Sequence, residues 1–143
     1  MIPGLDPKTV AVGQELPPLV KGPITREDLK AYATASGDPN PMHTDDEFAR
    51  TAGYPGVFAH GMLSMGYLGE LLVQAAGVGA VRRFKTRFAK LTWPGDVITC
   101  RGRVTRVADQ GAERLVECEI WTENQAGERK LLGSATLALT RAS

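Results

Sequence analysis

The residues whose types and spacing could do chemistry lie in one stretch, Ser36-Gly37-Asp38-Pro39-Asn40-Pro41-Met42-His43. It places a carboxylate, Asp38, five residues before an imidazole, His43, and both groups serve as general acids or bases near neutral pH. The two prolines fix their own φ angles and push the residues before them toward extended backbone. The reactive side chains therefore sit on a stiff arc, and we interpret the stretch as an acid/base site.

The same stretch has a simpler interpretation as a loop that ends a helix. Asp38 and Asn40 are turn-forming residues, and their side chains often accept hydrogen bonds from nearby backbone N–H groups. For Asn40, holding the loop is a better explanation than taking part in the reaction. The elements around the stretch must decide between a catalytic loop and a structural one.

Helices are expected on both sides of this stretch. Thr25 is expected to cap a helix that ends at Ser36-Gly37, because two acidic residues follow it in the first turn. A second, short helix is expected to start near residue 44 or 45 and to run to Gly53. It would present His43 from its N-terminal side.

A third and longer helix is expected over residues 59–76, apolar on nearly every side and therefore buried. Its glycines, Gly61, Gly66 and Gly69, lower helix propensity, so close approach of another backbone or a ligand is expected there. His60, at its start, is expected to cap or pack rather than to catalyse. Glu70, in its apolar sequence, is either functional or, more commonly for such a residue, paired with a structural partner.

Strands are expected on both sides of this helix. A weak strand signal lies within residues 10–20, where two prolines suit a sheet edge. From residue 78 onward the pattern has a period of two, and turns separate strands that end near residues 88, 107, 122 and 140. The sequence therefore predicts an α+β domain, in which a four-stranded antiparallel meander curves around the buried helix.

A row of basic residues, Arg83, Lys85 and Arg87, alternates with apolar and β-branched residues on the first of these strands. Such a row is either a solvated strand face or a binding surface for an anionic partner.

Composition limits the classes of function. The chain has 143 residues, 43% of them hydrophobic, and a formal net charge of +1, which disfavours a nucleic-acid or membrane-surface partner. No apolar run reaches the ~18 residues of a membrane span, and residues 1–6 lack the features of a signal peptide, so we expect a cytoplasmic location.

The cysteine and histidine content points to no metal or cofactor. Cys100 and Cys118 would lie three residues out of register, roughly 10 Å apart, on neighbouring strands, so we expect no disulfide. The two cysteines and two histidines are far apart in the sequence and do not predict a structural zinc site. No cofactor is expected.

Taken together, the motifs resemble those of the MaoC-like hydratases of the hot-dog superfamily. The pattern is an aromatic residue, a spacer, Ser-Gly-Asp-x-Asn-Pro-apolar-His, five residues and a small residue, and it is filled here by Tyr32, residues 36–43 and Ala49. A second block, residues 59–63, matches the start of the family's central helix. The resemblance covers residues 10–140 and implies a single hot-dog domain over residues 1–143, a curved antiparallel sheet wrapped around a long buried helix.

This resemblance implies a reaction and its residues. The reaction is the reversible hydration of trans-2-enoyl thioesters of coenzyme A or acyl carrier protein to (3R)-3-hydroxyacyl thioesters. Asp38 and His43 would be catalytic, in roles that the sequence does not rank, and the Gly61 amide would stabilise the enolate oxygen. Asn40 would hold the loop, and the basic row would contact phosphates of coenzyme A or an acidic carrier protein.

The resemblance also implies partners. Relatives are oligomeric, so a homodimer or higher homo-oligomer is expected. Gly69 stands where some members carry a serine that hydrogen-bonds the aspartate. In this feature the chain looks closer to the catalytic subunit of actinobacterial β-hydroxyacyl-ACP dehydratases, which work as heterodimers. A heterodimer is therefore an alternative. A non-catalytic domain that binds acyl thioesters, or supports a catalytic partner, is the second hypothesis. A thioesterase would need a nucleophile or base on the central helix, where Gly66, Gly69 and Glu70 offer only Glu70.

Overall fold

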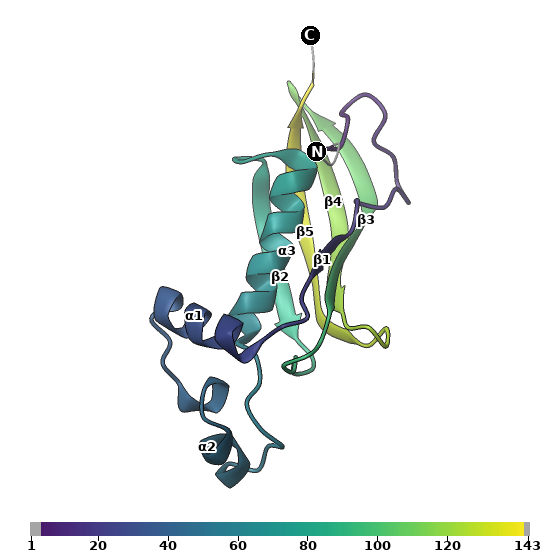
Figure 1. Cartoon of the computed structure of the whole chain (residues 1–143). Helices are drawn as coiled ribbons and strands as arrows, with labels where there is room; N and C mark the ends of the chain where they lie inside the picture. The colour runs from purple at the N-terminus through teal and green to yellow at the C-terminus, as the bar shows by residue number, and fades with distance from the viewer. Residues whose placement is uncertain (1–3, 142–143) are drawn as a thin grey trace.

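Helix α3 (Gly61–Ala76) runs along the middle of the molecule, and the other elements are arranged around it (Figure 1). Its sequence is apolar on most faces, and Leu68, Leu71 and Leu72 are completely or almost completely buried. A helix of this kind is stable only when it is covered on several sides, because burial of its side chains supplies most of its stability. The sheet provides that cover.

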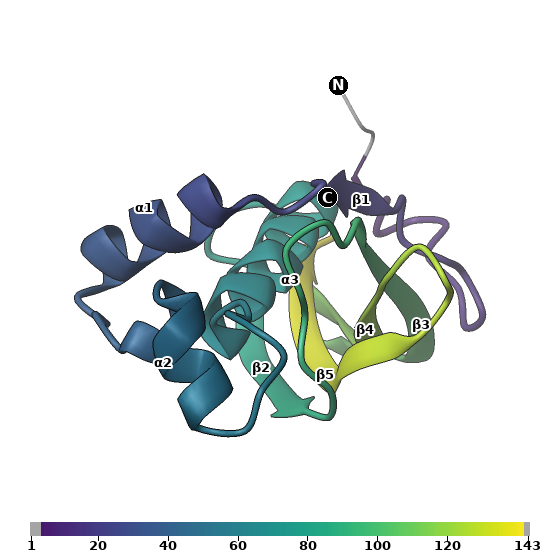
Figure 2. The same cartoon turned by 60° about the horizontal axis from the view of Figure 1, so that its bottom comes forward.

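The sheet has five strands, and every neighbouring pair is antiparallel. Their spatial order is β1-β3-β4-β5-β2. The strands are β1 (Leu19–Lys21), β2 (Val81–Phe88), β3 (Ile98–Gln110), β4 (Glu113–Glu123) and β5 (Arg129–Thr140). Figure 2, in which α3 is seen more nearly end-on, shows the sheet curving around this helix. The α+β class and the sheet wrapped around a buried helix are confirmed.

The predicted order of the strands is wrong in one respect. Strands β3, β4 and β5 form a meander, but β2 lies beyond β5 at the edge of the sheet instead of pairing with β3. The connection over residues 89–97 is too long for a tight hairpin. Its backbone is paired elsewhere, because Thr92 accepts from Ala59 and Asp96 accepts from Ile24. These hydrogen bonds hold the connecting segment across the N-terminal end of α3. The segment thus runs from β2, at one edge of the sheet, to β3, next to β1 at the opposite edge.

The segment that carries the Asp-His motif packs beyond the N-terminal end of α3 (Figure 1). Helix α1 (Arg26–Ser36) starts with a capping box between Thr25 and Asp28 and ends at Gly37, whose φ of 70° suits glycine. A 3₁₀ turn, η1 (Pro41–His43), and helix α2 (Asp46–Thr51), capped by Asp45, follow. The predicted helices are present, although α2 ends before Gly53 and α3 begins two residues later than expected.

The two cysteines are both buried and free. Cys118 lies opposite Val104 and Cys100 opposite Thr122, so their offset is four residues instead of the predicted three. The difference arises because the turn lies at residues 111–112, between the paired Gln110 and Glu113, instead of at 109–111. A register shift between Val104 and Arg106 then reduces the offset from five residues to four. Burial raises the pKa of Cys100 to about 12 and that of Cys118 to about 11, which keeps both thiols protonated and unreactive.

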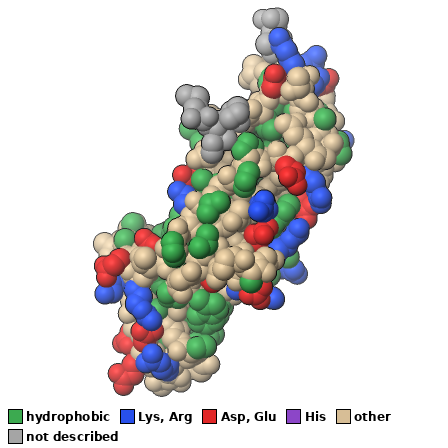
Figure 3. Space-filling model, turned by 45° about the vertical axis from the view of Figure 1, so that its right-hand side comes forward, with side chains coloured by type: hydrophobic (Ala, Val, Ile, Leu, Met, Phe, Trp, Pro, Cys, Tyr) green, Lys and Arg blue, Asp and Glu red, His purple; other side chains and the backbone are tan. Residues whose placement is uncertain are grey.

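Charges of both signs are mixed on the surface. Cross-strand ion pairs between β3 and β4 include Arg101–Glu123 at 2.9 Å and Arg103–Glu119 at 2.9 Å. Figure 3 shows basic and acidic side chains interspersed on the face that it presents, without a histidine in view. None of the helices within residues 4–141, the part of the chain that the structure describes, is long and apolar enough to cross a membrane. The ends of the predicted domain, and the first half of the segment assessed for a signal peptide, lie outside the described residues.

Replacement of Leu72 by alanine tests the role of α3 as the core. Leu72 is 0% exposed, so Leu72→Ala should lower the free energy of unfolding by about 2–5 kcal/mol. Val73→Ala on the same helix is the matched control, because Val73 is 40% exposed and should lose much less. Urea unfolding of both variants gives the comparison, and equal losses would contradict the buried position of this helix face.

Candidate functional site

His43 is largely buried, and its hydrogen bond sets its tautomer. Its Nδ1 lies 2.6 Å from the carbonyl oxygen of Phe58, so this nitrogen carries the proton and donates it. The Phe58 ring packs edge-on against the imidazole. The other ring nitrogen, Nε2, is therefore left with its lone pair, which is the form that a general base requires.

The charge state of His43 follows from its surroundings. Burial lowers the pKa of His43 from its ordinary value of 6.5, and the neighbouring ring of His60 adds to this effect. The hydrogen bond to Phe58 and the carboxylate of Asp38 act in the opposite direction and are outweighed. The imidazole is consequently neutral at neutral pH.

His60 joins the motif loop to α3. Its ring is 2% exposed and stacks on the ring of His43, with centroids 3.8 Å apart and planes inclined by 28°. Its Nε2 donates to the backbone carbonyl of Asp38 at 3.2 Å, and the ring of Tyr32 packs edge-on against it at 4.8 Å. The side chain makes no capping hydrogen bond to α3, so of the two expected roles only packing is observed.

Asp38 is held through its backbone, while its side chain remains accessible. Its amide donates to the carbonyl of Ala33 at 3.1 Å and its carbonyl accepts from His60, which fixes the residue between α1 and α3. The side chain is 53% exposed, and Oδ2 lies 3.9 Å from His60 Nε2. These contacts hold the backbone of Asp38, and its carboxylate faces the His60 ring.

Asn40 contacts the loop at two points. Its side-chain oxygen accepts from the amide of Met42 at 3.1 Å, and its own amide donates to Asp38 Oδ1 at 3.3 Å. These are local turn contacts of the kind expected for a residue that holds the loop.

The side chains of Asp38, His43 and His60 offer ligand atoms that all lie within 4.8 Å of one another. Proton positions limit what this cluster can hold. His60 Nε2 needs its proton to donate to the Asp38 carbonyl, so this nitrogen has no lone pair for a metal, whereas His43 Nε2 and the Asp38 carboxylate keep theirs. Because zinc sites use three or four deprotonated ligands, the arrangement suits acid/base chemistry better than metal binding.

Gly61 is the first residue of α3, where backbone N–H groups point out of the helix. Among residues 4–141, no group accepts a hydrogen bond from its amide. A Cβ atom at this position would lie 3.2 Å from carbons of the Phe88 ring, so glycine allows the aromatic ring to pack against the helix end. Gly69 faces Phe84 with ordinary contact, and Gly66 has open space, so the tight approach expected at all three glycines occurs only at Gly61.

A small pocket of about 120 Å³ lies beside this end of α3. The sequence reasoning missed one of its residues, Ser64, which is 1% exposed and whose hydroxyl has no hydrogen-bond partner within the described part of the chain. The available signal was a small polar residue three positions after Gly61 on a mostly apolar helix. The remaining lining comes from the helix start, β2, its following connection and β5: Phe58, Ala59, His60, Gly61, Phe88, Lys90, Leu91, Thr92 and Leu131.

Two other predicted features lie apart from the Asp-His cluster. Arg83, Lys85 and Arg87 are exposed on the edge strand β2, and no carboxylate lies within 4 Å of them in residues 4–141. Glu70, on α3, is paired with Lys21 of β1 at 2.9 Å, which is the structural partner expected for it.

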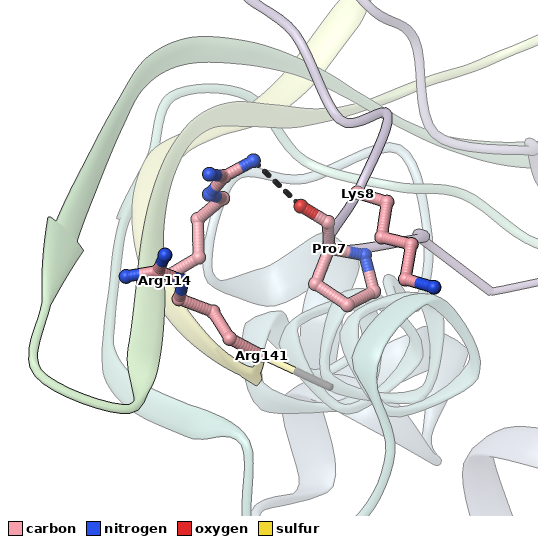
Figure 4. Close-up of a pocket in the computed structure, with 4 residues that line it drawn as sticks. All are labelled: Pro7, Lys8, Arg114 and Arg141. Atoms are coloured by element: carbon pink, nitrogen blue, oxygen red, sulfur yellow. Dashed lines mark hydrogen bonds between the residues drawn. The ribbon is translucent and has the colours of Figure 1, made fainter. Parts of the chain in front are cut away.

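A second pocket, of about 230 Å³, lies where the N-terminal segment meets the end of the sheet (Figure 4). Lys8, Arg114 and Arg141 line it, and Arg114 donates to the carbonyl of Pro7 at 2.7 Å. Asp109 pairs with Arg114 at 2.7 Å and with Arg141 at 3.8 Å. The arginines thus have structural partners, and the pocket contains none of the motif residues.

Comparison with known proteins identifies the family. Residues 8–125 match the family described as "MaoC like domain", and the chain belongs to this family. The unliganded R-hydratase PhaJ1 from Pseudomonas aeruginosa has a similar structure, with a TM-score of 0.84 and 26% identity, over 95% of this chain and 86% of that one. This match supports the hot-dog fold and membership of a hydratase and dehydratase family.

Two proteins of Mycobacterium tuberculosis are also similar. The 3-hydroxyacyl-thioester dehydratase Y is 37% identical over 79 residues, which are 52% of this chain and 27% of that relative. A chain of the ChsH1-ChsH2 complex shares the fold, with a TM-score of 0.79 and 21% identity, over 92% of this chain and 99% of that one.

The titration of His43 provides a test of the site's electrostatics. Because burial disfavours the imidazolium, the ring of His43 should titrate with a midpoint below 6.5 in the folded protein. Below pH 6.5 the unfolded chain then takes up this proton before the folded one does, so stability should fall as the pH decreases. NMR of the ring protons measures the midpoint, with the urea-unfolded protein as the control. A midpoint at or above 6.5 would contradict the described environment.

Proposed function

We propose that this chain catalyses the reversible hydration of trans-2-enoyl thioesters to (3R)-3-hydroxyacyl thioesters. The observation that carries the proposal is the neutral imidazole of His43, whose Nε2 has a free lone pair and which lies next to Asp38. The ring of His60, which stacks on it, places this imidazole close to the N-terminus of α3. Membership of the MaoC-like family supports this class of reaction.

In the proposed mechanism, Asp38 and His43 together bind the attacking water. His43 Nε2 takes a proton from the water while the oxygen forms its bond to C3, and the electrons of the C2=C3 bond move toward the thioester carbonyl. Asp38, with an accessible carboxylate, positions the water and shuttles the proton, which is delivered to C2 to complete the addition. The reverse sequence of steps expels water from the 3-hydroxyacyl thioester.

The enolate oxygen that develops on the thioester needs hydrogen-bond donors. In this proposal the Gly61 amide supplies one, since it points out of the positive end of the α3 dipole. The apolar lining around it excludes water, which strengthens such a hydrogen bond.

For the carrier of the acyl group, we propose contact with the basic row. Arg83, Lys85 and Arg87 are exposed, and their strand ends at Phe88, which lines the pocket. They would bind phosphates of coenzyme A or the acidic surface of an acyl carrier protein.

The size of the pocket favours a second chain. About 120 Å³ is less than the roughly 300–1,000 Å³ of most small-molecule sites, so one chain encloses only part of an acyl thioester. We expect a homodimer or higher homo-oligomer, or a heterodimer comparable with the ChsH1-ChsH2 complex, to complete the site. The alternative function is that of a non-catalytic domain that binds acyl thioesters or supports a catalytic partner. It also requires a second chain to complete the pocket.

Substitution of the two motif residues tests the mechanism. Asp38→Asn and His43→Gln should each lower turnover of crotonyl-CoA by about 10²–10⁴-fold, because each removes one acid/base group. Loss of ultraviolet absorbance of the conjugated thioester measures the rate, with a longer enoyl-CoA in parallel and circular dichroism to verify folding. Near wild-type turnover in both variants would refute the mechanism. A folded wild-type chain that is silent on both substrates would favour a carrier-protein substrate, an obligate partner or the binding-only alternative.

A further inference from the structure

The buried hydroxyl of Ser64 is not used by any contact described above. It lies one turn into α3, is 1% exposed and has no hydrogen-bond partner within residues 4–141. An unsatisfied buried polar group lowers stability, so native proteins keep few of them and often for a functional reason. Its position in the pocket beside Gly61 indicates what that reason is.

Ser64 and Gly61 lie on the same side of α3. Residues three apart are neighbours on a helix surface, and side chains lean toward the helix N-terminus. Both residues line the same pocket, most of whose other lining residues are apolar. The Ser64 hydroxyl and the Gly61 amide are therefore two donors on residues that line one small pocket, and neither has an acceptor among residues 4–141.

His60, which also lines the pocket, has a second buried atom without a partner among the described residues, Nδ1, and this atom differs from the Ser64 hydroxyl in its hydrogen-bonding role. In the neutral imidazole the single proton lies on Nε2, which donates to the Asp38 carbonyl, so Nδ1 carries a lone pair and can only accept. It cannot stabilise a negatively charged oxygen. Of these two unpartnered side-chain atoms, the Ser64 hydroxyl is suited to that task, as is the Gly61 amide, whereas the Lys90 ammonium in the lining is already paired with Glu128 at 3.6 Å.

We propose that the Ser64 hydroxyl is a second hydrogen-bond donor to the carbonyl oxygen of the thioester substrate, beside the Gly61 amide. This inference rests on the proposed hydratase function and adds a residue to it. As water attacks C3, charge accumulates on this oxygen, so both hydrogen bonds strengthen toward the transition state. Ser64 forms no covalent bond and loses no proton in this role.

Ser64→Ala tests the proposal through activity and stability together. Loss of one such donor should lower kcat for enoyl-CoA hydration by about 10²–10³-fold, with a much smaller change in KM. The melting temperature should stay the same or rise, because the variant loses no hydrogen bond and removes an unsatisfied group. A serine with only a structural role would give the opposite pattern, a lower melting temperature with kcat retained, and that result would overturn the proposal.

The first donor can be tested with a matched pair at Gly61. Proline is tolerated at the first position of a helix, and His60, with φ −58° and ψ 132°, already has the backbone that a residue before proline adopts. Gly61→Pro removes the N–H, whereas Gly61→Ala adds the same Cβ against Phe88 and keeps it. The proline variant should be slower than the alanine variant by about 10²–10³-fold, and equal rates would remove Gly61 as the first donor of the pair.

A spectroscopic test separates the role of Ser64 from the proposed function as a whole. In the slow variant His43→Gln, bound hexadienoyl-CoA should absorb at longer wavelength than free hexadienoyl-CoA, since donors to the carbonyl polarise the conjugated thioester. Addition of Ser64→Ala should reduce this shift while binding is retained. An equal shift in both proteins would overturn the role of Ser64 alone. Failure of the folded His43→Gln protein to bind the thioester would overturn the proposed function and this inference with it.

Discussion

The buried imidazole of His60 is the contact on which the site depends. It donates to the carbonyl of Asp38 and stacks on the ring of His43, and it directly precedes Gly61, the first residue of α3. The loop with the acid/base groups and the helix end with the exposed amide are consequently fixed relative to each other. Without this ring, a turn held by prolines and local Asn40 contacts would be joined to the central helix less directly. Reactive groups need this kind of support, because small displacements of them reduce catalysis strongly.

Unsatisfied polar atoms at the pocket lower the stability of the fold, and apolar burial elsewhere compensates for them. Three buried side-chain atoms lack a hydrogen-bond partner among the described residues, and two of them, His60 Nδ1 and Ser64 Oγ, lie at the pocket. The leucines of α3 and the interior of the sheet provide the compensating burial of apolar surface. Burial has a second effect, because it keeps His43 neutral at neutral pH. Burial beside Phe58 and His60 thus leaves the ring in the form that the proposed base requires.

Features that depend on residues close in sequence could be predicted from the sequence. The cap at Thr25, the turn that carries Asp38 and His43, and a helix start within two residues of Gly61 are all signalled by neighbouring residues. The fold class followed from the long apolar helix and the strands after it, together with the family resemblance.

Features that depend on distant partners could not be predicted in the same way. The position of β2 beside β5 is set by hydrogen bonds from the connecting segment to residues far along the chain. The offset of the cysteines depends on a register shift near Arg106. His60 was expected to cap or pack, but the ring that it packs against, that of His43 seventeen positions earlier in the sequence, is visible only in three dimensions. Ser64 was missed for the same reason, since only burial without a partner distinguishes it from an ordinary helix serine.

The most direct test of the account is a crystal structure of the slow variant Asp38→Asn with a bound trans-2-enoyl-CoA. If Asp38, His43 and Gly61 form the active site, the thioester oxygen should lie within about 2.7–3.1 Å of the Gly61 amide nitrogen, and C3 should face His43 Nε2. Ser64 Oγ should lie within hydrogen-bond distance of the same oxygen. A thioester bound away from the N-terminal end of α3, for example with its acyl chain against Lys8 and Arg141, would contradict the assignment of this cluster as the active site.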